Sequence, residues 1–174
     1  MMSPGFGVTV VVGSGRGFQM LSAGIVMGLA GTLAMDVWAI ILERVAGVAR
    51  PNWGAVGRWV VESSQGRVFH ESIGDVAEVP GENRIGWMFH YLVGAIYGLI
   101  FIALAGPAWL DAPDFISVWI FSLITIGAGW FLLQPGLGLG WAASKTPNPN
   151  KVRVLGLVAH TVFGLGMWAA ALAM

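Results

Sequence analysis

Three ionisable side chains lie inside long apolar stretches of this chain: Asp36, His90 and His160. A charged Asp facing lipid costs at least ~2.5 to 3.5 kcal/mol, so such a group is expected to be paired, protonated or solvated. An imidazole is a natural partner, because it titrates near neutral pH and can share a proton with a carboxylate. These residue types therefore allow proton or ion handling.

Gln134 is a fourth polar candidate in an apolar stretch, and it precedes Pro135, which lacks a backbone N–H and frees a carbonyl nearby. At a helical rise of 1.5 Å per residue, Asp36, His90 and His160 each lie ~9 to 10 Å inside the nearest charged residue. We therefore expect the four side chains to form one polar layer within the membrane.

Two cofactor hypotheses arise from the same residues. His90 and His160 could be the axial ligands of a b-type haem, with their neighbouring glycines leaving room for the porphyrin. Alternatively, Asp36 with the two imidazoles could bind a divalent metal such as Fe, Zn or Mn. No local ligand motif supports the metal site, because the three residues come from three separate stretches.

Four apolar stretches must position these residues. A membrane span needs roughly 20 mostly apolar residues, and the chain has 56% hydrophobic and only 10% charged residues. The expected spans are residues 18–43, 86–110, 115–141 and 153–174. The sequence thus predicts an all-α polytopic membrane protein, a four-transmembrane-helix bundle, and excludes an ordinary soluble domain.

The organisation around the spans is an outer-face N-terminal tail, residues 1–17, a membrane domain, residues 18–174, and a cytoplasmic interfacial loop, residues 44–85. Within this loop, residues 52–63 follow a proline and place apolar side chains near one helical face, which predicts an interfacial helix. We expect Arg58 and Glu62 to form an i,i+4 ion pair on its wet side.

Basic residues predict the topology. Eight of the nine lie between spans one and two or between spans three and four, and only Arg16 lies on the other side. Because basic loops stay in the cytoplasm, both termini are expected on the opposite, outward side.

Small residues indicate how the helices pack, since helices in lipid associate through close backbone approach. GxxxG pairs occur in the first three predicted spans. The steps Gly86, His90, Gly94 and Gly156, His160, Gly164 are identical, which suggests two related helical hairpins.

Several functions fit these features. We expect a non-enzymatic binding or interaction module, such as an accessory subunit of a larger membrane assembly. The alternatives are a small oligomeric proton-linked transporter and a haem or metal protein, while the polar residues could also serve only to fix the fold. The expected partners are the lipid bilayer and a homo-oligomer or larger complex; no nucleic-acid-binding feature is present.

The chain also resembles a family of uncharacterised bacterial inner-membrane proteins, a domain of unknown function with four predicted spans. The resemblance covers most of residues 24–171 and is carried by residues 57–59, 134–140, 143–147, 159–160 and 163–166. It implies a bacterial inner-membrane location and brings no catalytic role.

Overall fold

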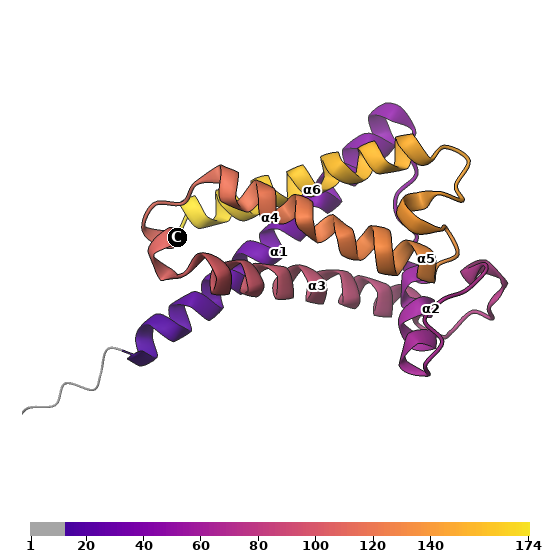
Figure 1. The fold of residues 1–174 in the computed structure, drawn as a ribbon, viewed down its shortest axis with the longest axis horizontal. Coiled ribbons are helices and arrows are strands. Elements are labelled where there is room, and N and C mark those ends of the chain that lie inside the picture. The colour runs from indigo at the N-terminus through magenta and orange to yellow at the C-terminus, as the bar shows by residue number, and fades with distance from the viewer. Residues whose placement is uncertain (1–12) are drawn as a thin grey trace, which may run out of the picture.

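A computed structural model of the protein describes residues 13–174 as a bundle of long helices (Figure 1). This part of the chain contains no strand, so the all-α prediction is confirmed. Of the predicted outer-face tail, residues 1–12 lie outside the described part, and residues 13–17 already belong to the first helix.

Four helices are long and apolar enough to cross a membrane, as the sequence predicts. The α-helices are α1 (Gly13–Ala46), α2 (Trp53–Ser64), α3 (Glu82–Ala105), α4 (Phe115–Ala128), α5 (Gln134–Gly136) and α6 (Pro149–Leu172). The shorter elements are η1 (Ile73–Asp75), η2 (Pro107–Asp111), η3 (Gly129–Leu133) and η4 (Trp141–Ala143). The candidate spans are α1, α3, α6 and the continuous run from α4 to α5.

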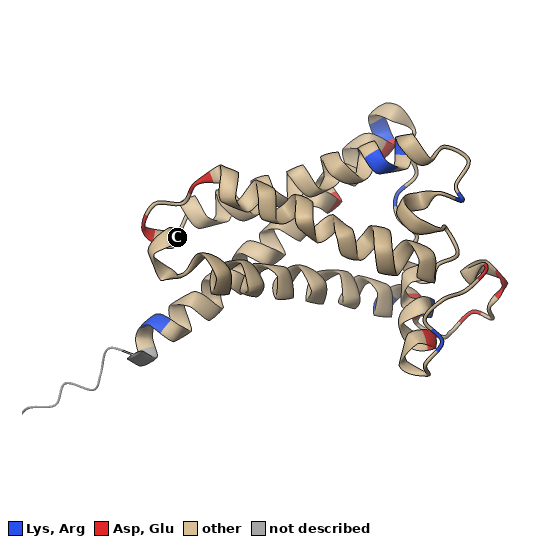
Figure 2. Cartoon of the chain, in the orientation of Figure 1, with Lys and Arg blue, Asp and Glu red and all other residues tan. Residues whose placement is uncertain are grey.

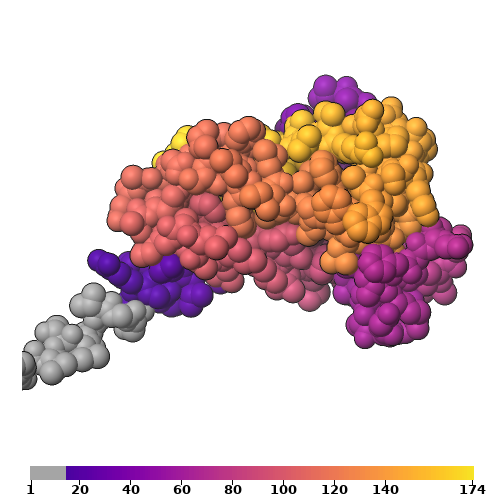
Figure 3. Space-filling view, in the orientation of Figure 1, coloured from indigo at the N-terminus to yellow at the C-terminus, as the bar shows by residue number. Residues whose placement is uncertain are grey.

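The four long helices pack mainly in the order α3, α1, α6 and α4, so that α1 and α6 each have two long neighbours. α1 packs against both α3 and α6, and α4 packs mainly against α6, while α2 lies across the end of α3. The beginning of α1 and the end of α6 lie at the same end of the bundle as η2 (Figure 1). α2 and the segment after α5 lie together at the other end (Figure 3).

Glycines bring α1 and α3 into backbone contact. A Cβ atom built on Gly28 would overlap with the carbonyl of Gly94, and one built on Gly98 would overlap with the carbonyl of Gly24. The GxxxG pairs of the first two spans therefore face each other across one helix crossing. On α6, a Cβ at Gly164 would lie 2.7 Å from the Ser122 hydroxyl of α4.

The apolar core lies between the spans and is distinct from the polar residues predicted as a site. Its fully buried members include Met27, Ile102, Val118 and Met167. Most other large apolar side chains of the spans are exposed, as expected for helices whose outer faces contact lipid.

The third span is irregular where it approaches Pro135. η3 is a π-helical turn, and α5 then ends at Gly136, before residue 141, where we expected the span to end. Pro135 has no N–H for the helical ladder and its ring crowds the carbonyl four residues earlier, so a wider turn relieves the clash. The chain leaves the helix through Gly138, which has a φ of +86°.

Candidate functional site

Asp36 of α1 and His90 of α3 form the centre of the candidate site. His90 Nε2 lies 3.1 Å from Asp36 Oδ1, and the Tyr91 hydroxyl donates a hydrogen bond of 2.7 Å to Asp36 Oδ2. The side chains of Asp36 and His90 are only 14% and 13% exposed. The carboxylate is thus held between two donors, and the imidazole–carboxylate pair can share one proton.

Aromatic rings pack against His90. Trp53, the first residue of α2, stacks on the imidazole with ring centroids 4.1 Å apart and planes 27° apart. Trp87 lies one turn before His90, and its ring centroid is 5.3 Å from that of Trp53. This stack fixes the orientation of the His90 imidazole.

A cavity of about 1060 Å³ adjoins this pair. It is lined by α1, by the segment that connects α1 to α2, and by α3, α5 and α6, so it opens between helices that come from all parts of the chain. Asp36, His90 and Gln134 all lie in its wall. Three of the four predicted polar residues therefore share one space.

Two polar atoms of the cavity wall lack a hydrogen-bond partner. Gln134 Oε1 and Trp38 Nε1 are both buried, and neither has a partner in the described part of the chain. Such atoms are rare in folded proteins, because an unpaired buried polar group costs about 1 to 3 kcal/mol. Both atoms are closed to solvent in this structure, so a molecule in the cavity reaches them only after a side chain rotates.

His160 lies in a different environment from the other three residues. Its Nδ1 donates a hydrogen bond of 2.9 Å to the Ser122 carbonyl and lies 3.1 Å from Thr125 Oγ1, both on α4. It is absent from the wall of the cavity. The expected layer of four residues is therefore a cavity group of three, with His160 engaged between α6 and α4, because α6 presents this face to α4.

This placement bears on both cofactor hypotheses. Within residues 13–174, no group of three or more His, Asp or Glu side chains is placed to hold one metal ion, so Asp36, His90 and His160 do not form a ligand set. A haem bound by both imidazoles would need them on one shared space, whereas His90 faces the cavity and α1 and His160 bonds to α4. Asp36, His90 and His160 therefore fit neither a shared metal ion nor a haem with two histidine ligands.

A helix, α2, is present where the sequence predicts an interfacial helix, but its predicted ion pair is wrong. Arg58 is 7% exposed and turns inward, where it forms two hydrogen bonds of 2.9 Å with the Glu82 carboxylate. It also donates to the carbonyls of Ile73 and Val76. The hydrogen-bonded Glu82 raises the pKa of Arg58 above its ordinary value.

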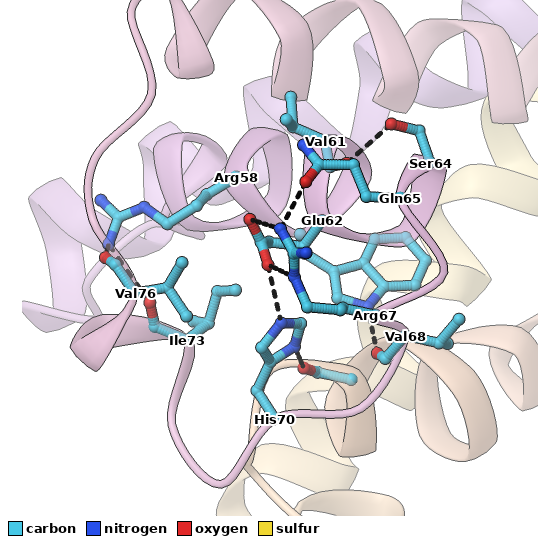
Figure 4. Close-up of polar contacts among 12 residues, drawn as sticks. Arg58, Val61, Glu62, Ser64, Gln65, Arg67, Val68, His70, Ile73 and Val76 are labelled. Carbon is cyan, nitrogen blue, oxygen red and sulfur yellow. Dashed lines mark hydrogen bonds and ion pairs between the residues drawn. The ribbon is translucent and has the colours of Figure 1, made fainter.

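Glu62 instead pairs with Arg67, and His70 approaches the same carboxylate (Figure 4). The hydrogen bonds from Arg67 lower the pKa of Glu62 below its ordinary value. His70 Nδ1 also donates a hydrogen bond of 2.9 Å to the Gly136 carbonyl. The segment after α2 is therefore docked against α5 and the residue that follows it.

Sequence reasoning missed three residues of the site: Tyr91, which bonds to Asp36, and Trp38 and Lys151, which lie in the cavity wall. Tyr91 follows His90 directly, so its contact with Asp36 could have been inferred once the α1–α3 pairing was known. Trp38 and Lys151 carry no such signal, because the cavity wall that they share is set by how α1 and α6 approach each other.

Fold and site together define a small polytopic α-helical membrane protein with a mostly apolar cavity between its spans and an ionisable pair in the cavity wall. More particularly, the chain belongs to the family described as "Protein of unknown function (DUF2938)", whose sequence pattern matches residues 25–174. The resemblance to a family of unknown function is thereby confirmed. No curated protein and no solved structure matches the chain.

Proposed function

We propose that the protein is a non-enzymatic binding module of the membrane, and that its cavity binds a small molecule next to Asp36 and His90. The observation that carries this proposal is the cavity of about 1060 Å³ with an ionisable pair in its wall. Ligand sites are typically concave, mostly apolar, and have a few convergent polar groups, which is the character of this wall.

The unpartnered atoms of Trp38 and Gln134 support the same proposal. Both residues belong to the cavity wall, and a side-chain rotation that exposes the two atoms would let a bound molecule satisfy the Trp38 donor and the Gln134 acceptor. Ordered water could satisfy them as well, so the test must detect a molecule other than water.

A proton-linked transporter is the second candidate, and the Asp36–His90 contact favours it. An intramembrane carboxylate bonded to an imidazole beside a cavity can release or take up a proton as a solute binds. Four spans are few for alternating access in one chain, so this function requires a homo-oligomer. A binding module can also act as an accessory subunit, in which case it binds a protein of a larger membrane assembly.

A cavity-filling substitution tests the binding proposal. Ala39 lies in the cavity wall, and Val37, two residues earlier on α1, is 48% exposed outside it. We expect mass spectrometry of the denatured, detergent-purified protein to find a small molecule in the wild type and in Val37→Trp, and to find it lost from Ala39→Trp. An Ala39→Trp protein that keeps the molecule, or a wild type that carries only detergent, would contradict the proposal.

The two histidines provide a second, matched comparison. We expect His90→Ala to lose the bound molecule and His160→Ala to keep it, because only His90 lies in the cavity wall. The transporter candidate adds a further expectation: in proteoliposomes carrying the solute, His90→Ala abolishes proton-coupled uptake. Uptake by the His90→Ala protein at the wild-type rate would exclude that candidate.

A further inference from the structure

One cation of the cavity wall, Lys151, has no ion-pair partner in the described part of the chain, and the side of the cavity where it lies is called the mouth here. Four charged side chains lie in the wall, Asp36, Glu43, Arg50 and Lys151. Asp36 is bonded to His90 and Tyr91, and Arg50 pairs with Glu43 at 2.8 Å. Within residues 13–174, the Lys151 ammonium group has no carboxylate within ion-pair distance.

Lys151 also lies in an unfavourable place for a cation. It belongs to the first turn of α6, which Asn148 caps by accepting a hydrogen bond from the Lys151 N–H, and this turn contains no acidic residue. The helix dipole places partial positive charge at an N-terminus, so a lysine there adds like charge. The Lys151 ammonium group and the positive end of the α6 dipole both favour an anion at the mouth of the cavity.

The walls below the mouth are suited to an apolar body. Trp53, Trp87, Val152 and Leu155 belong to the wall. The volume is at the upper end of the range of small-molecule sites, about 300 to 1000 Å³. A single inorganic anion would leave most of this space and its apolar surface unfilled.

We infer that the cavity binds an amphipathic anion, with a phosphate or carboxylate head group at Lys151 and an apolar body along the tryptophan-lined wall. This inference rests on the proposed function, since it names the chemical class of the bound molecule. Two sources offer this chemistry: an anionic membrane lipid and a single-chain amphipathic anion that enters from water.

Native mass spectrometry of the full chain in dodecylmaltoside tests the inference. The protein is titrated separately with dioctanoylphosphatidylglycerol, dioctanoylphosphatidylcholine and octyl phosphate. We expect one of the two anions to bind in preference to the zwitterionic lipid. We expect Lys151→Gln to weaken that binding about fivefold, which corresponds to the loss of one partly solvated charge contact. Lys145→Gln is the matched control, because Lys145 is exposed at the same end of the bundle and lies outside the cavity wall.

Each outcome has a defined meaning. Preference for phosphatidylglycerol supports a membrane lipid, and preference for octyl phosphate supports a single-chain anion. Equal binding of phosphatidylcholine, or Lys151→Gln binding as tightly as the wild type, overturns the inference. Suppose that the inference is overturned but the wild type carries a molecule that Ala39→Trp lacks. The cavity then binds a ligand of another class, and the proposed function stands. If Ala39→Trp carries the same molecule as the wild type, the inference and the proposed function both fail.

Discussion

Single residues in this protein acquire their roles through partners that come from other helices. Asp36 is held by His90 and Tyr91 of α3. His160 lies between two glycines of α6 at the same spacing as His90 in α3, but it bonds to α4. The two histidines thus share a sequence context but differ in access to the cavity. A histidine with a titratable neighbour in a cavity wall is the better candidate for function.

Arg58 offers a prediction about stability. Arg58→Met leaves the Glu82 carboxylate and the carbonyls of Ile73 and Val76 without their donor, and we expect a lower thermal unfolding midpoint in micelles. Arg58→Lys should restore only part of the loss, because an ammonium group cannot reproduce the two-pronged geometry. Arg84→Met, at an exposed position of α3, is the control and should leave the midpoint unchanged.

Glu62 gives a prediction about pH. Arg67 lowers its pKa in the folded protein, so the ion pair stabilises the fold fully above the ordinary pKa of a glutamate and progressively less as pH falls through the lowered value. We expect the segment after α2 to become more sensitive to protease as the pH drops below about 4.5. Arg67→Gln should be more sensitive already at neutral pH and should change less with acid; an identical acid response in both proteins would contradict this.

At the scale of elements, the close approach of α1 to α3 aligns the candidate site. Gly28 meets the backbone of Gly94 one turn from His90, so the distance between the two helices also sets the distance between Asp36 and His90. In the third span, the π-helical turn directly precedes Gln134, so the width of this turn helps to set the position of Gln134 in the cavity wall.

Gly28→Ala tests the helix crossing. The added Cβ would overlap with the Gly94 carbonyl, so the helices must separate, and we expect a destabilisation of roughly 1 to 3 kcal/mol. Gly127→Ala on α4 is the matched control, because its Cβ would meet only the Phe131 ring at 3.8 Å. Thermal unfolding in micelles measures both; equal midpoints for the two variants would show that the α1–α3 contact is not tight.

At the scale of the whole molecule, charge is distributed unequally between the two ends of the bundle. The end that carries α2 and the start of α6 holds eight of the nine basic residues together with most of the acidic ones, whereas the end that carries η2 has Asp111, Asp114 and Arg16 (Figure 2). This distribution underlies the proposed orientation, with the cavity mouth toward the cytoplasm. A bacterial inner-membrane location is part of the same proposal.

Reporter fusions in a bacterial host test this orientation. Alkaline phosphatase is active only after export, so a fusion after Met174 should be active and one in the loop before α6 inactive. Green fluorescent protein, which needs the cytoplasm to fluoresce, should give the opposite pattern at the same two positions. The reverse result with both reporters would place the basic loops outside and the cavity mouth with them.

The sequence by itself determined the four apolar helices, the all-α class and the helix at residues 53–64, because hydropathy and helix-start signals are local properties of consecutive residues. It also pointed to Asp36, His90 and Gln134 as polar residues inside apolar helices. Only the tertiary structure decided that Arg58 pairs with Glu82 and not with Glu62, and that His160 bonds to α4. Those outcomes depend on which face each helix turns toward its neighbours, and that rotation is set by glycine contacts between segments far apart in the chain.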